Sequence, residues 1–276
     1  MNIVEIRGNN EIIVITPTKD IKSKLAVDFI NTIKSKSYYN PRIILIESSG
    51  IEFHFSRNMN MGINEALKYN PKYIALSNDD VRPMEMYWDY KLINRIVENQ
   101  LAYVSPLFIN SNGQIKGPLI NMPPYLGVLF STTFYPLIPQ FTFPFIRKIN
   151  SLLSNKKNDI HDSSMFPGII NTQPFSIFNS NILKKVKGFS EDFLNGCEDL
   201  ELALRINLLG FKYGLDTTVK FLDFNSATKG PGGFSIFQYK RSDMQQVNNW
   251  KTLIKKYRKS DYEKATLPND NKIVFT

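Results

Sequence analysis

Two acidic motifs of this chain lie at the ends of predicted secondary-structure elements. An Asn-Asp-Asp motif at 78–80 directly follows the apolar run 73–76, and a Glu-Asp pair at 198–199 directly precedes the amphipathic run 200–209. Carboxylates at a strand end suit a divalent cation, which prefers oxygen ligands. A carboxylate at a helix start elsewhere in the chain suits a general base. Transfer of a sugar from a nucleotide donor requires both functions, so the chemical hypothesis starts from these motifs.

Apolar runs alternate with helical patterns in the first 80 residues. The runs 12–15, 42–46 and 73–77 predict buried strands. Residues 24–36 and 60–69 predict the two helices between them. This β-α-β-α-β order predicts a parallel, doubly wound α/β sheet. Because ligands bind outside the carboxyl ends of such strands, the polar residues after the three strands should converge on one crevice.

The rest of the chain contains both element types and one unusual apolar segment. Further helices are predicted at 86–100, 179–186, 199–209 and about 238–258, and further strands at 102–104, 172–178 and 212–223. Residues 117–146 have no charged side chain but contain six prolines, which exclude a membrane-spanning helix. Three interpretations of this segment stay open: a lid on the acceptor side, a contact with a membrane interface, and ordinary core packing.

Charge and cysteine content limit the compartment and the partners. The chain of 276 residues has a net charge of +9, and residues 229–264 hold nine Lys or Arg against three acidic side chains. This segment favours an anionic partner (a membrane surface, a phosphorylated acceptor or nucleic acid), although a solvated helix face explains it equally well. The single cysteine, Cys197, allows no internal disulfide and is expected to be a small buried residue. The polar N-terminal segment is unlike a signal peptide. We therefore expect a cytoplasmic protein, and the basic segment is compatible with a position at the inner face of a membrane.

The segment around the Glu-Asp pair resembles a known family. Residues 174–178, 183–193 and 196–205 read PFSIF, LKKVKGFSEDF and GCEDLELALR. This is similar to the "vGgFdE.f" run and the following "EDvdl..R" run of the family-2 glycosyltransferases of the GT-A fold, including rhamnosyltransferase-like members. Few other families share that order and spacing. The resemblance extends from residue 11 to about residue 230 and is poor near 115–165.

The resemblance implies donor contacts at the first two strand ends. Residues 12–18 resemble the first strand of the family and its Pro-Thr turn, so Thr16, Pro17 and Thr18 are expected to line the nucleotide base with their backbone. Glu47 stands where the family usually has an Asp that contacts the base or ribose. Its longer side chain is a departure that alters the expected nucleotide preference.

The Asn-Asp-Asp motif sits where the family has its DXD-type motif. By this resemblance Asp80 is the metal ligand, Asp79 reaches the ribose or the sugar, and Asn78 belongs to the donor site. Asn60, in a segment like the family's "N.GI" helix start, is expected at the base edge. Mn²⁺ or Mg²⁺ is the expected cofactor, since oxygen ligands suit hard ions. The structural alternative is that Asp79 and Asp80 cap a following helix.

The Glu-Asp pair is expected to supply the general base. The resemblance implies Asp199 as the base that accepts the proton of the acceptor hydroxyl, with Glu198 as the second candidate. Direct displacement assisted by one base inverts the configuration at the anomeric carbon. Acidic residues are also favoured at a helix N-terminus by the helix dipole, and this role is compatible with catalysis.

A departure from the family pattern lies near residue 225. The family often has a metal-binding His after the strand that follows the Glu-Asp helix, and Asn225 stands near that place. An amide oxygen is a weaker ligand than imidazole for Mn²⁺, so either low metal affinity or a water molecule in that position is expected. The glycine-rich loop 229–233 resembles a lid over a pyrophosphate, which makes Lys229 a candidate phosphate contact. A plain surface turn explains these glycines equally well.

These observations predict an α/β protein of the GT-A fold, with a Rossmann-like, mostly parallel sheet between helices and a small C-terminal helical extension. The catalytic domain is expected at 1–228. It would comprise a donor half at 1–110, a variable apolar insertion on the acceptor side at 111–170, and an acceptor and base half at 171–228. Residues 229–276 are expected to form a basic flexible loop and a helical tail.

The expected function is that of an inverting, metal-dependent glycosyltransferase. It would move a sugar from a UDP, dTDP or GDP donor to a hydroxyl of a glycan, lipid-linked or protein-linked acceptor, with a peripheral membrane contact where the acceptor is lipid-linked. The alternative is a catalytically degenerate protein of the same fold that only binds nucleotide or glycan. A third hypothesis is nucleic-acid binding by the basic segment. Its aromatic residues have the spacing of a packed helix, and no nucleic-acid motif is present, so we expect no nucleic-acid partner.

Overall fold

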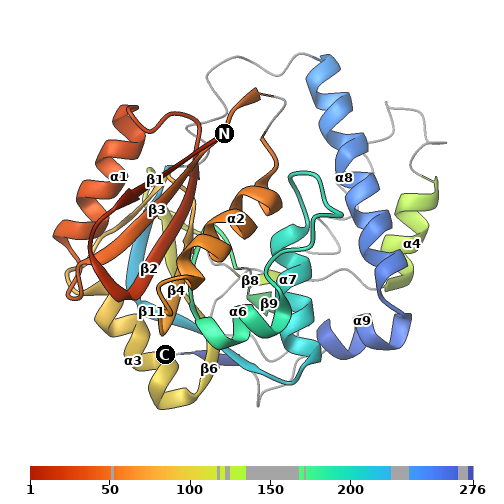
Figure 1. Cartoon of the computed structure of the whole chain (residues 1–276). Helices are drawn as coiled ribbons and strands as arrows, with labels where there is room; N and C mark the ends of the chain where they lie inside the picture. The colour runs from red at the N-terminus through yellow and green to blue at the C-terminus, as the bar shows by residue number, and fades with distance from the viewer. Residues whose placement is uncertain are drawn as a thin grey trace.

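The structure is a computed structural model of the whole chain (Figure 1). The residues that it describes are 1–50, 53–116, 119–121, 125–134, 168–170, 172–224, 236–266 and 273–275. Most of the apolar segment 117–146 therefore lies outside the described residues, as does the glycine-rich loop 229–233.

A mixed β-sheet forms the centre of the molecule. In the described part of the chain it has ten strands, eight of which follow one another in the order β1-β3-β2-β4-β10-β6-β11-β12. These eight are β1 (Asn2–Ile6), β2 (Asn9–Thr18), β3 (Pro41–Glu47), β4 (Tyr73–Ser77), β6 (Leu101–Asn110), β10 (Phe175–Asn179), β11 (Lys212–Asp223) and β12 (Ile273–Phe275). The short strands are β5 (Val81–Pro83) beside β11, β7 (Ile115–Lys116) beside β6, and the separate pair β8 (Leu119–Asn121) and β9 (Gly168–Ile170).

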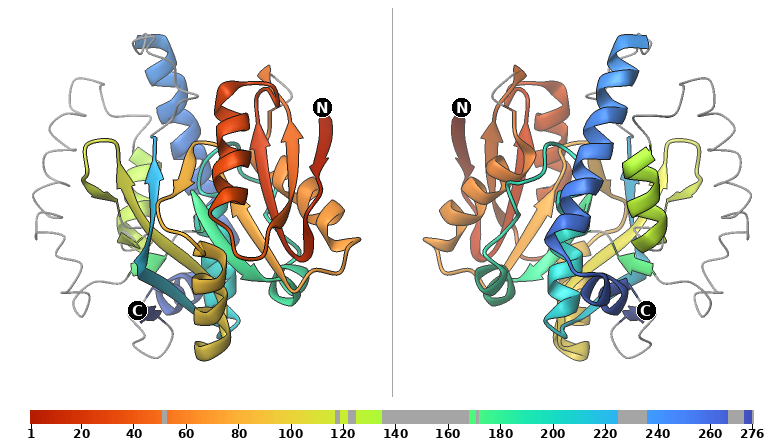
Figure 2. Two further views of the ribbon diagram at one scale, coloured as in Figure 1. Left: turned by 90° about the vertical axis from the view of Figure 1, so that its left-hand side faces the viewer. Right: turned by 90° about the vertical axis from the view of Figure 1, so that its right-hand side faces the viewer.

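Helices cover both faces of the sheet, so the predicted α/β class is confirmed (Figures 1 and 2). The helices are α1 (Lys24–Ser35), α2 (Phe55–Leu67), α3 (Trp88–Asn99), α4 (Tyr125–Phe134), α6 (Ser180–Val186), α7 (Glu198–Leu208), α8 (Ile236–Lys256) and α9 (Lys259–Thr266). One hydrophobic cluster joins α1 and α3 to one face, and another joins α2, α6 and α7 to the opposite face.

Strand β2 explains why the predicted strands are apolar along their whole length. Ile12 and Val14 belong to the cluster under α1 and α3, whereas Ile13 and Ile15 belong to the cluster under α2. Successive side chains of a strand point to opposite faces, so a strand covered on both sides needs apolar residues throughout.

The first three predicted strands form a parallel unit. Strand β2 pairs in parallel with β3 on one side and with β4 on the other. The register aligns Thr18 with Glu47, so the carboxyl ends of β2 and β3 lie side by side. Strand β10 runs antiparallel to both β4 and β6 and links this unit to the second half of the sheet.

Helix α2 begins at Phe55 and therefore starts earlier than the predicted helix at 60–69. Its N-cap is His54, whose ring nitrogen Nδ1 accepts a hydrogen bond from the N–H of Arg57 at 3.4 Å. Gly62 allows the close approach of α2 to the sheet, because a Cβ atom there would lie 2.2 Å from Cγ2 of Ile15.

The C-terminal helices pack on the main domain. Residues of α8 and α9, including Leu253, Tyr262 and Ala265, form a third hydrophobic cluster with α7. Figure 2 shows α8 and α9 on the same side of the molecule as α4, which contacts both. The last strand, β12, pairs in parallel with β11 and so joins the central sheet, which the sequence pattern did not predict.

Two further predictions concern the apolar segment 117–146, which was predicted not to form a membrane-spanning helix, and Cys197, which was predicted to be buried. Within the described ranges, no helix has both the length and the apolar character required to cross a bilayer. The part of the 117–146 segment that forms α4 packs against the C-terminal helices, with the ring of Tyr125 at 5.6 Å from that of Tyr262. Cys197 is buried, as predicted, in the cluster of α7, α8 and α9.

Candidate functional site

A pocket lies at the carboxyl ends of β2, β3 and β4. Its volume is about 350 Å³. The lining residues come from the end of β2, from the segments after the three strands, and from the start of α2 and the residues before it: Pro17, Thr18, Lys19, Ser48, Ser49, Gly50, Phe53, Phe55, Asn78, Asp79 and Asp80. The predicted convergence of the three strand ends on one crevice is therefore confirmed.

The carboxylate of Asp79 is fixed at the wall of this pocket. Its Oδ2 atom accepts a hydrogen bond of 2.8 Å from the hydroxyl of Thr18, which joins the ends of β2 and β4. Burial raises the pKa of Asp79, while the Thr18 hydroxyl and the positive charge of Arg82 act in the opposite direction. The buried Arg82 guanidinium also donates to the carbonyl oxygens of Asp79 and Leu25, each at 2.7 Å. The polypeptide around Asp79 is therefore held from two sides.

Asp80 lies beside the end of β11. Its carbonyl oxygen accepts a hydrogen bond of 3.1 Å from the N–H of Phe224, the residue that follows β11. Asn225, the predicted second metal ligand, comes next in the sequence and lies outside the described residues, as does Lys229. The motif is followed by strand β5, and helix α3 begins only at Trp88 without a side-chain cap. The helix-capping interpretation of Asp79 and Asp80 is therefore wrong.

The acidic side chains of the pocket suit a hard divalent ion. In the described ranges no group of three or more His, Cys, Asp or Glu side chains is arranged to hold a metal. Mg²⁺ and similar ions are commonly held by one or two carboxylates, with substrate phosphates and water completing the shell. The pocket carboxylates of Asp79 and Asp80 fit this kind of site, which depends on the substrate for its remaining ligands.

The other predicted donor residues have different positions. Thr16 is fully buried, and its hydroxyl donates to the carbonyl oxygen of Ser77 at 2.6 Å, so its side chain links β2 to β4. Glu47 accepts a hydrogen bond of 3.1 Å from the N–H of Ile21 and stabilises the loop after β2. Neither Thr16 nor Glu47 lines the pocket. Their proposed contacts with the nucleotide stay predictions.

Asn60 also lies outside the pocket lining and is bound to the loop before α7. Its Oδ1 atom accepts the N–H of Phe189 at 2.8 Å, and its Nδ2 donates to the carbonyl oxygen of Phe189 at 2.9 Å. Nδ2 also donates to Oε1 of Glu191 at 3.1 Å. Both ends of the Asn60 amide thus hold polypeptide from the second half of the chain, and its contact with a base edge stays a prediction.

Glu198 and Asp199, hereafter the acid pair, begin helix α7. The preceding residue, Cys197, has a left-handed backbone (φ 67°), and no side chain caps the helix. Glu198 is buried, and its Oε2 accepts the N–H of Gly196. Asp199 is half-buried, and its Oδ1 accepts the N–H of Leu200 at 2.8 Å.

Burial and the neighbouring Asp199 charge raise the pKa of Glu198. The cause is that two adjacent carboxylates in a desolvated site cannot both ionise easily. A pair in which one carboxyl keeps its proton longer than the other is the usual requirement for assigning acid and base roles. Glu198 is the member of the pair whose pKa is raised, and Asp199 beside it stays the general base predicted from the sequence.

Residues 172–174 connect the two acidic motifs. The N–H of Asn78 donates to the carbonyl oxygen of Pro174 at 2.9 Å. Two residues earlier, the hydroxyl of Thr172 donates to the carbonyl oxygen of Asp199 at 3.4 Å. The acid pair does not line the pocket itself, but a three-residue segment holds its helix to the Asn-Asp-Asp motif.

Helix α2 makes a second connection between the pocket and the acid pair. Phe55 lines the pocket, and its backbone N–H donates a hydrogen bond of 3.1 Å to Oδ1 of Asn195. Asn195 lies three residues before Glu198. Phe53, Phe55 and the exposed Lys19 were not predicted from the sequence as site residues. For Lys19 a signal was present, since it directly follows the Thr-Pro-Thr turn at the end of β2.

Comparisons with known proteins found distant structural similarity alone. No family model matches the chain, and no curated protein matches it. A197 from STIV has a TM-score of 0.46 and 11% identity, over 78% of this chain and 86% of that one. TarS from S. aureus has a TM-score of 0.48 and 10% identity, over 78% of this chain and 37% of that one. A shorter TarS chain gives 0.42 and 10% over 79% and 58%. The chain thus spans less than two thirds of either TarS chain, and at these TM-scores function must be argued from the site.

Proposed function

We propose that the protein is an inverting glycosyltransferase of the GT-A fold that uses a nucleoside-diphosphate sugar. One observation carries the proposal: the segment 172–174 holds the Asn-Asp-Asp motif and the acid pair together at one edge of the sheet. At one end the segment contacts Asn78, which lines the pocket with carboxylates on its wall, and at the other end it contacts Asp199, the candidate base. Donor and acceptor chemistry need such an arrangement of two separate acidic groups.

The pocket of about 350 Å³ would hold the nucleotide part of the donor, with the base near the backbone of Pro17 and Thr18. A volume of this size is within the range of ordinary ligand sites. Asp80 would hold Mn²⁺ or Mg²⁺, with Asn225 as a further ligand and Asp79 directed to the ribose or sugar. The ion would supply positive charge to the departing diphosphate. Lys19 and Lys229 are the proposed phosphate contacts from the protein.

Asp199 would act on the acceptor. Its carboxylate takes the proton of the acceptor hydroxyl while the new bond from that oxygen to the anomeric carbon forms. The bond from the anomeric carbon to the diphosphate oxygen breaks in the same step, so the electron pair leaves with the nucleoside diphosphate and the configuration inverts. Glu198, whose pKa is raised, would bind a proton more readily than an ordinary carboxylate, which would favour the negative charge on Asp199.

The acceptor is proposed to be a glycan or a lipid-linked hydroxyl compound at the inner face of a membrane. The basic charge of the C-terminal segment supports an anionic surface, although part of it is used internally. Lys256 pairs with Glu201 at 3.3 Å and with Asp192 at 3.0 Å, and Lys259 pairs with Glu263 at 3.7 Å. The remaining basic side chains would face the anionic surface, and nucleic acid is not proposed as the partner because the sequence contains no nucleic-acid motif.

The test measures release of nucleoside diphosphate from UDP-glucose, dTDP-rhamnose and GDP-mannose in the presence of Mn²⁺. Asp80→Asn and Asp199→Asn should each lower the rate by about a hundredfold or more. Glu98→Gln, which removes an exposed carboxylate on α3, is the matched control and should keep wild-type activity. Retention of activity in both site variants would refute the proposal. Nucleotide binding without turnover of any donor would favour the degenerate binding protein instead.

A further inference from the structure

The loop 187–197, which joins α6 to α7, delivers the acid pair to the site. Helix α7 has no side-chain cap at its start, and the left-handed Cys197 leads into it. The first turn of a helix leaves backbone N–H groups without partners inside the helix, so its position depends on surrounding structure. What holds the loop 187–197 therefore determines where the acid pair lies.

Two asparagines from separate helices hold this loop in the same way. Asn60 of α2 binds both backbone groups of Phe189. Asn249 of α8 does the same at Leu194: its Oδ1 accepts the N–H at 3.2 Å, and its Nδ2 donates to the carbonyl oxygen at 3.1 Å. Asn249 is 4% exposed. An amide that satisfies both groups of one residue fixes that residue in place, as a neighbouring strand would.

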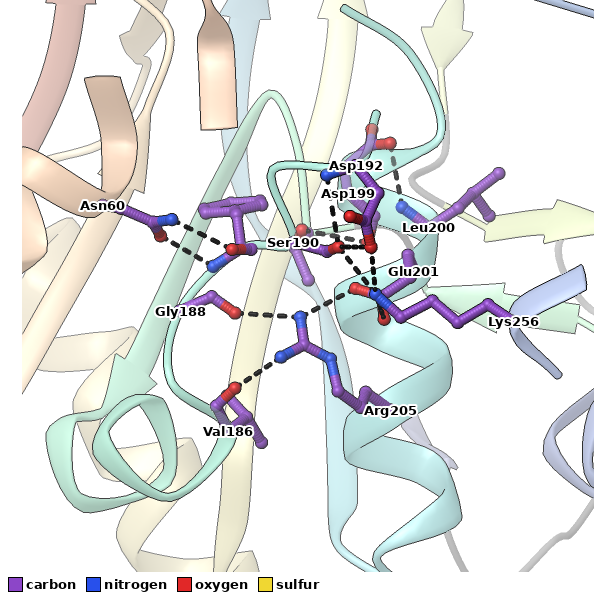
Figure 3. Close-up of polar contacts among 12 residues, drawn as sticks. Asn60, Val186, Gly188, Ser190, Asp192, Asp199, Leu200, Glu201, Arg205 and Lys256 are labelled. Atoms are coloured by element: carbon purple, nitrogen blue, oxygen red, sulfur yellow. Dashed lines mark hydrogen bonds and ion pairs between the residues drawn. The ribbon is translucent and has the colours of Figure 1, made fainter. Parts of the chain in front are cut away.

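Lys256, at the end of α8, ties the same loop to α7. Figure 3 shows its ammonium group between the loop and the helix. It donates to the hydroxyl of Ser190 at 2.6 Å and to Oδ2 of Asp192 at 3.0 Å, and it lies 3.3 Å from Oε1 of Glu201. Glu201 is fully buried one turn after Glu198. Helix α8 thus contacts both the loop before the acid pair and α7, the helix that carries the acid pair.

Glu201 is the centre of this contact. Its carboxylate also accepts hydrogen bonds from Arg205 at 2.7 Å and from the hydroxyl of Tyr257 at 2.7 Å. Arg205 in turn donates to the carbonyl oxygens of Val186 and Gly188, at the start of the loop (Figure 3). A buried carboxylate requires such compensation, because an unpaired charge in the interior is strongly unfavourable. The loop 187–197 is therefore bound to α7 by Arg205 of α7 and by Lys256 of α8.

We propose that Asn249 and Lys256 of α8 are positioning residues that set the place of Glu198 and Asp199, an inference that rests on the proposed function of the acid pair. These two residues act through Leu194, Asp192 and Glu201 and do not line the nucleotide pocket. Helix α8 is thus a part of the base half of the site. Loss of the contacts of Asn249 and Lys256 should lower turnover and leave nucleotide binding unchanged, because a displaced base weakens the chemical step without changing the pocket.

The experiment compares adjacent residues of the same helix. Asn249→Ala and Lys256→Met are the test variants. Asn248→Ala and Lys255→Met remove exposed neighbours and serve as controls. Hydrogen exchange of the backbone amides at 188–197 is measured first, since it needs no substrate. Two further quantities are measured next. One is the hydrolysis rate of the donor that the wild-type protein accepts, and the other is the binding of the nucleoside diphosphate of that donor in the presence of Mn²⁺.

We expect exchange at 188–197 to become faster by about tenfold or more in the test variants and to stay unchanged in the controls. Turnover should fall by about 10- to 100-fold with the dissociation constant of the nucleotide unchanged, and Lys256→Arg should restore much of it. Unchanged exchange, or an equal loss of nucleotide binding, would overturn the inference. If the wild-type protein hydrolyses no donor, the proposed function fails, and the exchange result still decides whether α8 positions the loop.

Discussion

The hydroxyl of Thr18 donates a hydrogen bond of 2.8 Å to Oδ2 of Asp79, although the two residues are 61 positions apart. Both residues are nearly completely buried and both line the pocket. The bond joins the ends of two parallel strands at the place where the donor is proposed to bind. A buried carboxylate that loses a hydrogen-bond donor destabilises the folded state, so this contact affects the free energy of unfolding as well as the shape of the pocket.

Replacing Thr18 by Val tests this contact. The variant keeps the shape of the side chain but leaves Oδ2 of Asp79 without its hydroxyl donor. We expect the free energy of unfolding, measured by urea denaturation, to fall by about 1–3 kcal/mol. Thr18→Ser keeps the hydroxyl, so its free energy of unfolding should fall clearly less than that of Thr18→Val. A Thr18→Val protein as stable as the wild type would show that the hydrogen bond to Asp79 contributes nothing measurable to stability.

Nucleotide binding should depend on metal. Binding to the folded state raises apparent stability by mass action, so a thermal-shift series with UDP, dTDP and GDP, each with and without Mn²⁺, reads out the pocket directly. One nucleotide should raise the melting temperature of the wild-type protein, and only when Mn²⁺ is present. Asp80→Asn should remove the metal-dependent part of the shift. A shift of equal size without Mn²⁺ would contradict the role proposed for Asp80.

The acid pair should make stability depend on pH. Burial, followed by the charge of Asp199, raises the pKa of Glu198 from 4.5 to about 7. The folded state therefore keeps a proton that the unfolded state has already released, and this contribution, fully present below about pH 4.5, is lost as the pH rises through about 7. The Glu198→Gln variant does not titrate at this position and has no such loss. As the pH rises through this window, the free energy of unfolding of the variant should therefore increase relative to that of the wild type, by up to about 3 kcal/mol.

Urea unfolding of both proteins at about pH 5 and about pH 8 measures that gain. The amide of the variant keeps an oxygen that can accept the N–H of Gly196, so the local hydrogen bond is preserved. A difference between the two proteins that does not change with pH would show that Glu198 titrates normally.

Gly62 should tolerate no side chain. A Cβ atom at this position would lie 2.2 Å from Cγ2 of Ile15, so α2 must move away from the sheet. Gly62→Ala is expected to lower the free energy of unfolding by about 1–3 kcal/mol, against the usual gain from replacing glycine in a helix. Asn64→Ala, on the exposed face of α2, is the control and should change stability little. A stabilised Gly62→Ala protein would mean that the helix is free to shift.

The first half of the sheet was predictable from the sequence because its strands are buried on both faces. The bounds of β4, Tyr73–Ser77, agree with the predicted strand at 73–77. The start of α2 was predicted five residues late, since its N-cap is the ring of His54 and not one of the usual capping residues. The convergence of the strand ends followed from topology, because parallel strands place their carboxyl ends at one edge.

The contacts of single site residues were not predictable in the same way. The sequence did not indicate that the amide of Asn60 binds Phe189, which is 129 residues away in the sequence. It did not indicate either that Glu47 binds the N–H of Ile21. Spacing places a residue at a strand end or on a helix, but the partner of a side chain depends on which distant segment packs beside it. For the same reason nothing in the sequence indicated that Asn249 holds Leu194.

The position of β10 has a consequence for synthesis on the ribosome. Strands β4 and β6 are complete by Asn110, but the strand that lies between them begins only at Phe175. At roughly 5–20 residues per second, the nascent chain waits several seconds before that strand exists. During this time β4 and β6 each present an unpaired edge, which is a template for contact with other chains. The nascent protein should therefore need chaperone protection until the segment around Phe175 has left the exit tunnel.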